Sequence, residues 1–142
     1  MHLASRILAY LLAAFMLFMG VQKFIGDVPI FAIIEANTGL GFVDPLFRFV
    51  TGLIEIAAAG LLVFGQRLIG GALSTLITAG AVGAHLTVLG VSTPESGFPD
   101  GVTAATFQCG QDSVACSPFL FVLAIGALAV SAFVTAAARP AG

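Results

Sequence analysis

Long apolar runs, separated by short polar segments, dominate the chain. A helix needs about 20 mainly apolar residues to cross a hydrocarbon core of about 30 Å. The pattern predicts an all-α membrane protein, a four-transmembrane-helix bundle formed as a single membrane domain over residues 1–142. We expect the first span to be retained, because it contains no small-x-small site at which a signal peptide would be cleaved. The four expected spans are 7–25, 46–64, 69–90 and 118–138.

Two dipeptides mark the expected starts of spans. Asp44-Pro45 and Ser117-Pro118 each place a capping side chain directly before a proline. Asp and Ser accept hydrogen bonds from the first helical amides, and proline is favoured at the first helical position. The turn at 65–67 is so short that the second and third spans must be antiparallel neighbours.

Two longer segments, 26–45 and 91–117, are expected to form loops on the same side of the membrane. In the first loop, Asp27 is a candidate N-cap for a short helix of one to two turns that ends near 37–39. Its apolar side chains would lie in the membrane interface or fold back into the bundle. These side chains are Ile30, Phe31, Ile33 and Ile34.

Composition supports this interpretation and excludes other classes of protein. Hydrophobic residues make up 59% of the chain, charged residues 8%, and the mean hydropathy is +1.12. A globular domain averages about 45–50% apolar and about 25% charged residues. The chain therefore cannot cover itself as a soluble fold, and its expected surroundings are the lipid bilayer. The net charge of −2 leaves no basic patch for nucleic acid.

Basic residues indicate the orientation. Four spans place both termini on one side, which carries Arg6, Arg67 and Arg139, whereas the opposite side carries Lys23 and Arg48. Basic residues are enriched in cytoplasmic segments. We therefore expect a multi-pass protein of a bacterial-type inner (plasma) membrane, with both termini cytoplasmic and the two long loops outside.

Glu55 lies near the middle of the second span, about 9 residues or roughly 14 Å from its outer end. An ionised acid at the centre of a membrane costs on the order of 2.5–3.5 kcal/mol. Glu55 should therefore face the bundle and be either protonated or paired. It is a candidate catalytic residue, and the alternative is a protonated carboxyl that only bonds a neighbouring helix.

His85 lies roughly 8 Å below the outer end of the third span. It falls on one helical face with other polar or small residues, so this face is polar. We expect His85 to act with Glu55 as a second catalytic residue. No metal site is predicted, because a ligand set needs further His, Cys or carboxylate groups and His2 is at the wrong end of the chain. The other members of the face are Ser74, Thr78 and Ala81.

Three polar residues near the outer surface are candidate ligand-binding residues. Lys23, preceded by Gln22, closes the first span, and Arg48 opens the second. Arg48 precedes Glu55 by seven residues, close to two turns, so the two occupy one face. Together with His85 these residues predict a polar track from the outer surface to the middle of the membrane. The alternative for Lys23 and Arg48 is that they extend to the lipid headgroups.

Cys109 and Cys116 are the two cysteines of the chain and share the second outer loop. An oxidising periplasm favours a disulfide between them. Closing so small a loop stabilises it by roughly 2–3 kcal/mol, which is a sufficient structural reason for the bond. A redox-active pair is the alternative, although the usual C-x-x-C spacing is absent.

The glycines and charged residues of the first two spans form a known pattern. Gly20-Val21-Gln22-Lys23, followed by Thr51-Gly52-Leu53-Ile54-Glu55 and an alanine-rich stretch to Leu62, resembles the G-x-x-K and G-x-x-E-x-x-x-x-x-L pattern of DoxX-like membrane proteins. The resemblance covers residues 6–134. By matching position, the lysine and glutamate conserved in the family would be Lys23 and Glu55. His85 and the two cysteines lie outside the pattern.

The resemblance implies a four-helix membrane protein with a redox-associated accessory role. The family takes its name from a likeness to the membrane subunit of thiosulfate:quinone oxidoreductase, and relatives are associated with methylamine dehydrogenase maturation and with thiol or oxidative-stress handling. No cofactor follows from the residues themselves, but the resemblance makes quinone a possible one.

Two functions remain open at this point. The first is a redox-associated protein that binds quinone or another small amphiphile between spans one, two and three. The second is a non-catalytic structural or assembly subunit, docked in a larger membrane complex or a homo-oligomer. Transport is a third possibility, but four spans enclose little pathway unless the chain oligomerises.

Overall fold

The computed structural model describes residues 2–26, 28–98, 100–110 and 114–139. Its helices are α1 (His2–Ile25), α2 (Pro29–Thr38), α3 (Arg48–Val63), α4 (Arg67–Ala84) and α5 (Phe119–Ala137). Two π-helical turns extend the bundle helices: η1 (Val43–Phe47) leads into α3, and η2 (His85–Leu89) continues α4. The short strands β1 (Thr93–Pro94) and β2 (Cys116–Ser117) pair antiparallel.

Within the described ranges, four helices are long and apolar enough to cross a membrane. This number and their positions agree with the expected spans, and the build is that of a multi-pass membrane protein. Each has at most a third of its most apolar window buried inside the protein, so most of its side chains face outward. The four are Leu3–Ile25, Val43–Val63, Arg67–Leu89 and Phe119–Ala137.

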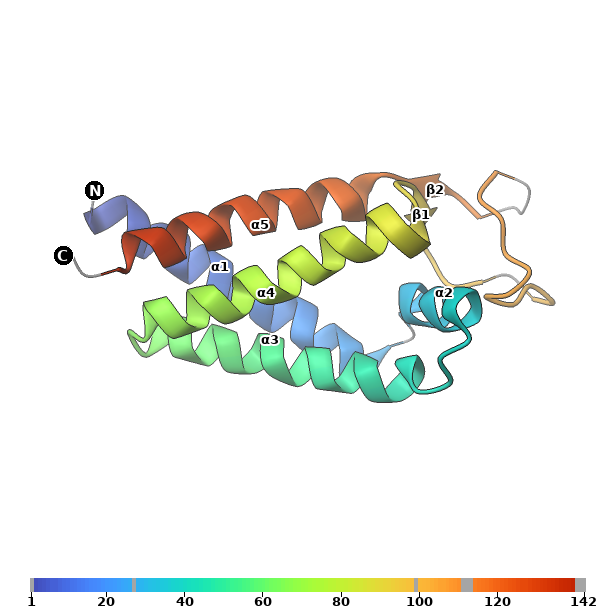
Figure 1. Ribbon diagram of the computed structural model, residues 1–142, viewed down its shortest axis with the longest axis horizontal. Coiled ribbons are helices and arrows are strands. Elements are labelled where there is room, and N and C mark those ends of the chain that lie inside the picture. Colours follow the sequence, from blue (N-terminus) through green and yellow to red (C-terminus); the bar gives the residue numbers. More distant parts are fainter. Residues whose placement is uncertain (1, 27, 99, 111–113, 140–142) are drawn as a thin grey trace.

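The four long helices form an open bundle (Figure 1). Helix α1 packs mainly on α3, α3 on α4, and α4 on α5, so the antiparallel pairing of α3 and α4 across the short turn is as predicted. Helix α1 begins and α5 ends at the same end of the bundle, here called the terminal end. From there α1 and α5 diverge toward the opposite end, here called the loop end, and they share fewer contacts than the other neighbours.

The buried apolar core lies toward the terminal end. Its members come from α1, α3 and α5, where these helices are closest together. Because α1 and α5 separate toward the loop end, side chains do not fill the space between them there. The core consists of Ala9, Leu12, Ala13, Met16, Ala59, Leu62 and Val134.

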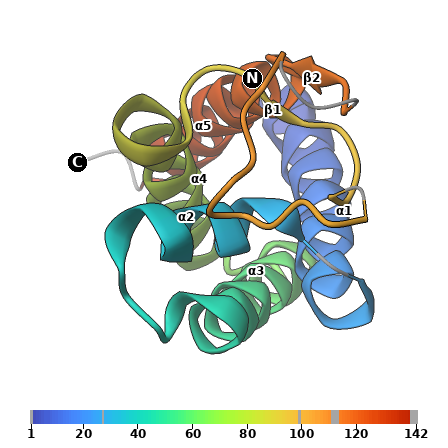
Figure 2. The same cartoon turned by 90° about the vertical axis from the view of Figure 1, so that its right-hand side faces the viewer.

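Helix α2 lies across the loop end (Figure 2). Phe31 and Ile33 are buried, which corresponds to the expected alternative of folding back onto the bundle. The helix ends as predicted, because Gly39 adopts a φ of 71° and donates its N–H to the Glu35 carbonyl. With 10 residues it is longer than one to two turns. The expected cap, Asp27, lies outside the described residues.

The start of the second span differs from the prediction in its side-chain bonding. Asp44 has the extended backbone of an N-cap residue, with φ −116° and ψ 121°, but its buried Oδ1 atom accepts no hydrogen bond from the described residues. The amide that it would cap, that of Phe47, donates instead to the Phe42 carbonyl at 3.1 Å. The Asp44 carboxylate therefore pairs with Arg48 at 2.9 Å.

The start of the fourth span is close to the prediction. The Ser117 hydroxyl accepts a hydrogen bond from the Phe119 amide at 3.4 Å. Helix α5 begins at Phe119, so Pro118 occupies the N-cap position rather than the first helical position. The span thus starts one residue later than expected.

Candidate functional site

Lys23 of α1 and Glu55 of α3 form a buried ion pair inside the bundle. The Lys23 Nζ and Glu55 Oε2 atoms are 2.5 Å apart, and the two side chains are 8% and 7% exposed. Of the two states expected for Glu55, the structure places it in the paired one. Lys23 does not extend to the membrane surface, as the alternative for this residue required.

Two glycines bring the paired helices together. A Cβ atom on Gly20 would lie 2.8 Å from the Gly52 carbonyl oxygen, and one on Gly52 would lie 3.2 Å from the Lys23 Cβ. Only glycine therefore allows the backbones to approach this closely. Each glycine precedes its charged residue by three positions, so the close contact and the ion pair lie on the same helix faces.

Helix α2 covers the ion pair from the loop end. The Lys23 Nζ lies 5.8 Å from the centroid of the buried Phe31 ring. An ammonium group is attracted to the face of an aromatic ring, more strongly where water is excluded. Phe31 therefore satisfies a side of the ammonium that Glu55 does not reach.

Arg48 does not join this pair. Its guanidinium forms an ion pair with the Asp44 carboxylate, donates a hydrogen bond to the Gly26 carbonyl at 2.8 Å, and lies 5.0 Å from the Phe49 ring centroid. Arg48 thus ties η1 and α3 to the end of α1. Of the residues of the predicted polar track, the structure brings Lys23 and Glu55 together but does not bring Arg48 to them.

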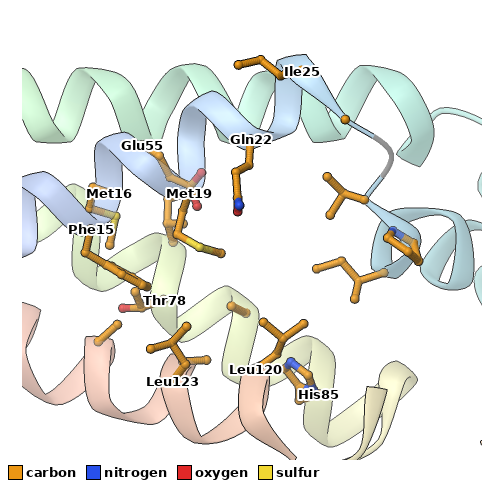
Figure 3. A pocket seen from close by; sticks show the side chains of 18 residues that line it. Phe15, Met16, Met19, Gln22, Ile25, Glu55, Thr78, His85, Leu120 and Leu123 are labelled. Atoms are coloured by element: carbon orange, nitrogen blue, oxygen red, sulfur yellow. The ribbon is translucent and has the colours of Figure 1, made fainter. Parts of the chain in front are cut away.

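A cavity of about 470 Å³ opens between the diverging helices. Residues of α1, α3, α4 and α5 line it, and the start of α2 forms its boundary at the loop end (Figure 3). Its wall is mainly apolar, with phenylalanine, methionine and leucine side chains. The polar side chains on the wall are those of Gln22, Glu55, Thr78 and His85.

His85 is 4% exposed and begins the π-helical turn η2. Its Nδ1 lies 2.9 Å from the Gly90 carbonyl oxygen, and its ring centroid lies 5.4 Å from that of Phe121. These contacts fix the ring at the wall of the cavity. The structure therefore brings His85 and Glu55 to the same cavity from different helices, as the prediction of a joint site requires.

The polar face predicted on the third span is largely confirmed. Ser74, Thr78 and His85 are buried, and Ala81 lines the cavity although it is exposed. Ser74 and Thr78 donate to carbonyls one turn earlier, those of Gly70 and Ser74, each at 2.8 Å. The Thr78 hydroxyl also lies 3.3 Å from the Ser131 hydroxyl of α5, which links the two helices.

No match to a protein-family model, a curated protein or a solved structure was found for this chain. The resemblance to DoxX-like proteins therefore stays a prediction that rests on the residues quoted for it.

The two cysteines form the predicted disulfide. Cys109 and Cys116 are bonded, with 5.8 Å between their Cα atoms. The bond lies in the exposed segment between η2 and α5, next to the β1–β2 pair, and neither cysteine lines the cavity. Among the described residues, no three His, Cys, Asp or Glu side chains cluster in a way that could hold a metal ion.

Sequence reasoning missed most of the cavity wall. Met16 and Met19 of α1 and Leu120 and Leu123 of α5 line it, yet each looks like any other apolar residue of a span. It also missed Phe31 as a partner of Lys23. One signal was present in the sequence: the equal spacing of Gly20 to Lys23 and of Gly52 to Glu55 indicates two faces that pack together.

Proposed function

We propose that this chain is a DoxX-like integral membrane protein with a redox-associated accessory role, which binds quinone or another small amphiphile in the cavity. The observation that carries the proposal is a mainly apolar cavity of about 470 Å³ among four candidate spans, with the buried Glu55 and His85 on its wall. Ligand sites of this kind are concave and mostly apolar, with a few placed polar groups.

Each polar residue at the cavity has a separate proposed role that follows from its chemistry. Glu55 and His85 are the groups that would pass the two protons taken up when a bound quinone receives two electrons from a partner oxidoreductase, since both can accept and release a proton. Gln22 offers an amide to the ligand head group. Lys23 holds Glu55 in place and supplies the positive charge beside it.

The proposed setting is a bacterial-type inner membrane with the terminal end in the cytoplasm. This orientation rests on Arg6, Arg67 and Arg139 at the terminal end, against Lys23 and Arg48 at the loop end, both of which are held by internal partners. It places α2 and the disulfide-closed segment outside, where an oxidising compartment preserves the bond.

The test is to purify the protein from membranes under mild conditions and to identify the lipid-soluble molecules that copurify. Quinone reduction is then compared between membranes that contain the parent protein, Glu55→Gln or His85→Ala. Leu86→Ala is the matched control, because Leu86 follows His85 on the same turn but is 67% exposed. We expect both site variants to lower turnover and the control to leave it unchanged. Unchanged turnover in both site variants would remove these residues from the proposed role.

A second candidate function is that of a non-catalytic subunit of a larger membrane complex. The observation that favours it is the pairing of β1 with β2 outside the bundle, next to the Cys109–Cys116 disulfide. Native mass measurement after gentle solubilisation tests this function. A stable assembly that loses a partner when the disulfide is removed supports it, whereas an isolated 14.4 kDa chain contradicts it.

A further inference from the structure

The hydrogen-bonding state of His85 determines what its free ring nitrogen can do. A carbonyl oxygen accepts hydrogen bonds and cannot donate one, so the Nδ1 atom that faces the Gly90 carbonyl at 2.9 Å carries a proton. In a ring with one proton, Nε2 is then an acceptor. Among the described residues, Nε2 has no hydrogen-bond partner. His85 therefore presents an unused acceptor at the cavity wall.

Glu55 and Thr78 are also acceptors. Lys23 takes the Glu55 Oε2 atom, and no described residue donates to Oε1. The Thr78 hydroxyl lies 2.8 Å from the Ser74 carbonyl oxygen, to which it donates, and 3.3 Å from the Ser131 hydroxyl of α5, so its remaining capacity toward another group is that of an acceptor. Gln22 is the one wall side chain that can donate, and its amide can accept as well.

The cavity continues toward the lipid. A second hollow, of about 360 Å³, lies between α1 and α5, and Phe15, Leu123 and Ala127 line both. We call this second hollow the α1–α5 groove. Among the residues that line it, Leu11, Phe119 and Val122 are 61%, 64% and 62% exposed, so the groove opens on the outer surface of the bundle. Since α2 bounds the cavity at the loop end, the apolar exit runs sideways between α1 and α5.

We infer that the cavity takes an amphiphile whose head group donates hydrogen bonds, of the phenol or hydroquinone class rather than the corresponding dione, and whose tail leaves through the α1–α5 groove. This inference rests on the proposed function, because it specifies the ligand of the same site. A hydroxyl head group donates to the unused acceptors of His85 and Glu55. A dione brings only carbonyl oxygens, for which the Gln22 amide is the one donor among the wall side chains. A buried polar group left without a hydrogen-bond partner reduces the favourable free energy of binding, and this loss is larger for the dione head group than for the hydroxyl head group.

The first experiment measures binding of three probes to the purified protein in lipid nanodiscs without oxygen: a decyl-substituted benzoquinone, its hydroquinone, and the dimethyl ether of that hydroquinone. We expect the hydroquinone to bind about tenfold more tightly than the other two, since one or two well-made hydrogen bonds separate them. His85→Phe should reduce this preference at least about threefold, and Leu86→Ala should keep it.

The second experiment tests the exit path. Ala127→Phe places a ring where the cavity meets the α1–α5 groove, whereas Ala129→Phe adds the same ring at an exposed position that lines neither hollow. We expect the first variant to weaken binding of the decyl hydroquinone about tenfold or more and the second to leave it unchanged. Equal effects of the two variants would overturn the proposed path.

The outcomes separate the inference from the function on which it rests. Equal or tighter binding of the dione or the ether overturns the donor preference while leaving an amphiphile site in place. Binding of none of the three probes overturns both the inference and the proposed quinone-class ligand. The comparison of the three probes on the parent protein stands even if a variant does not fold.

Discussion

At the scale of single residues, Lys23 contacts groups from two other helices, the Glu55 carboxylate of α3 and the Phe31 ring of α2. Removing one partner of a buried pair leaves the other charge uncompensated, whereas replacing both with apolar groups is often neutral. We therefore expect the pair to determine how α1 and α3 pack against each other more than it adds to stability.

A double-mutant cycle tests this view of the pair. Lys23→Met and Glu55→Met should each lower the free energy of unfolding by about 3–5 kcal/mol, because each leaves a buried charge alone. The double variant should lose much less than the sum of the two. Thermal unfolding in micelles, followed by circular dichroism, is the measurement, with the exposed Glu95→Gln as control. Strictly additive losses would contradict the account.

The glycine contact beneath the pair makes a second prediction at this scale. Gly20→Ala would bring a methyl group within 2.8 Å of the Gly52 carbonyl oxygen, so the helices must separate. We expect a loss of about 1–3 kcal/mol, as for other overpacked sites. Gly60→Ala is the matched control in α3, since nothing lies within 4 Å of its added Cβ. A control variant as unstable as Gly20→Ala would show that helix composition, and not the contact, causes the loss.

Individual residues also show the limit of prediction from sequence. The depth of Glu55 followed from its position in a span, and so did the need for a partner. That the partner is Lys23 and not Arg48 could not be read from spacing, because Arg48 shares a helix face with Glu55. The outcome depends on Asp44 and Gly26, which engage Arg48 at the loop end. Such choices depend on tertiary contacts between distant segments.

At the scale of elements, the four spans were predictable because apolar length is a local property of the chain. The π-helical turns η1 and η2 extend α3 and α4 at the loop end, and no comparable pattern in the sequence predicted them. Helix α2 was expected but underestimated, since its length depends on Phe31 and Ile33 finding a buried surface. The sequence pattern of such a segment is the same whether its apolar side chains face the lipid or pack on the bundle of its own chain.

The disulfide-closed segment offers a prediction at this scale. We expect no free thiol in the native protein and two after reduction, as counted by alkylation and mass spectrometry, because Cys109 and Cys116 are bonded. The paired variant Cys109→Ser/Cys116→Ser should lose about 2–3 kcal/mol from the stability of the loop. Binding in the cavity should not change, since neither cysteine lines it. Reduced binding in this variant would couple the segment to the site.

At the scale of the whole molecule, the bundle is tight at the terminal end and open at the loop end. At the terminal end, the apolar core that includes Ala9 and Val134 packs α1, α3 and α5 together. At the loop end, the divergence of α1 and α5 leaves space for the cavity. The sequence predicted the number of spans but not this difference, because the divergence of α1 and α5 depends on contacts between segments that are distant along the chain.

Orientation in the membrane can be tested on the whole chain. In a background without the native cysteines, Ser96→Cys near the loop end should react with a membrane-impermeant maleimide on intact cells. Gln66→Cys, in the turn between α3 and α4, should react only after the membrane is opened, because that turn is at the terminal end. Both positions are exposed, so accessibility within the protein does not limit the reaction. The reverse labelling pattern would place the termini outside.

In the proposed membrane setting, the separation of α1 and α5 means that acyl chains, rather than a further transmembrane helix, would complete the wall beside Glu55 and His85. The surrounding lipid would then form part of the proposed site, and its viscosity and thickness would act directly on the space proposed for the ligand. A cell that alters its fatty acids in the cold or under stress would thereby retune this chamber without synthesising any new protein.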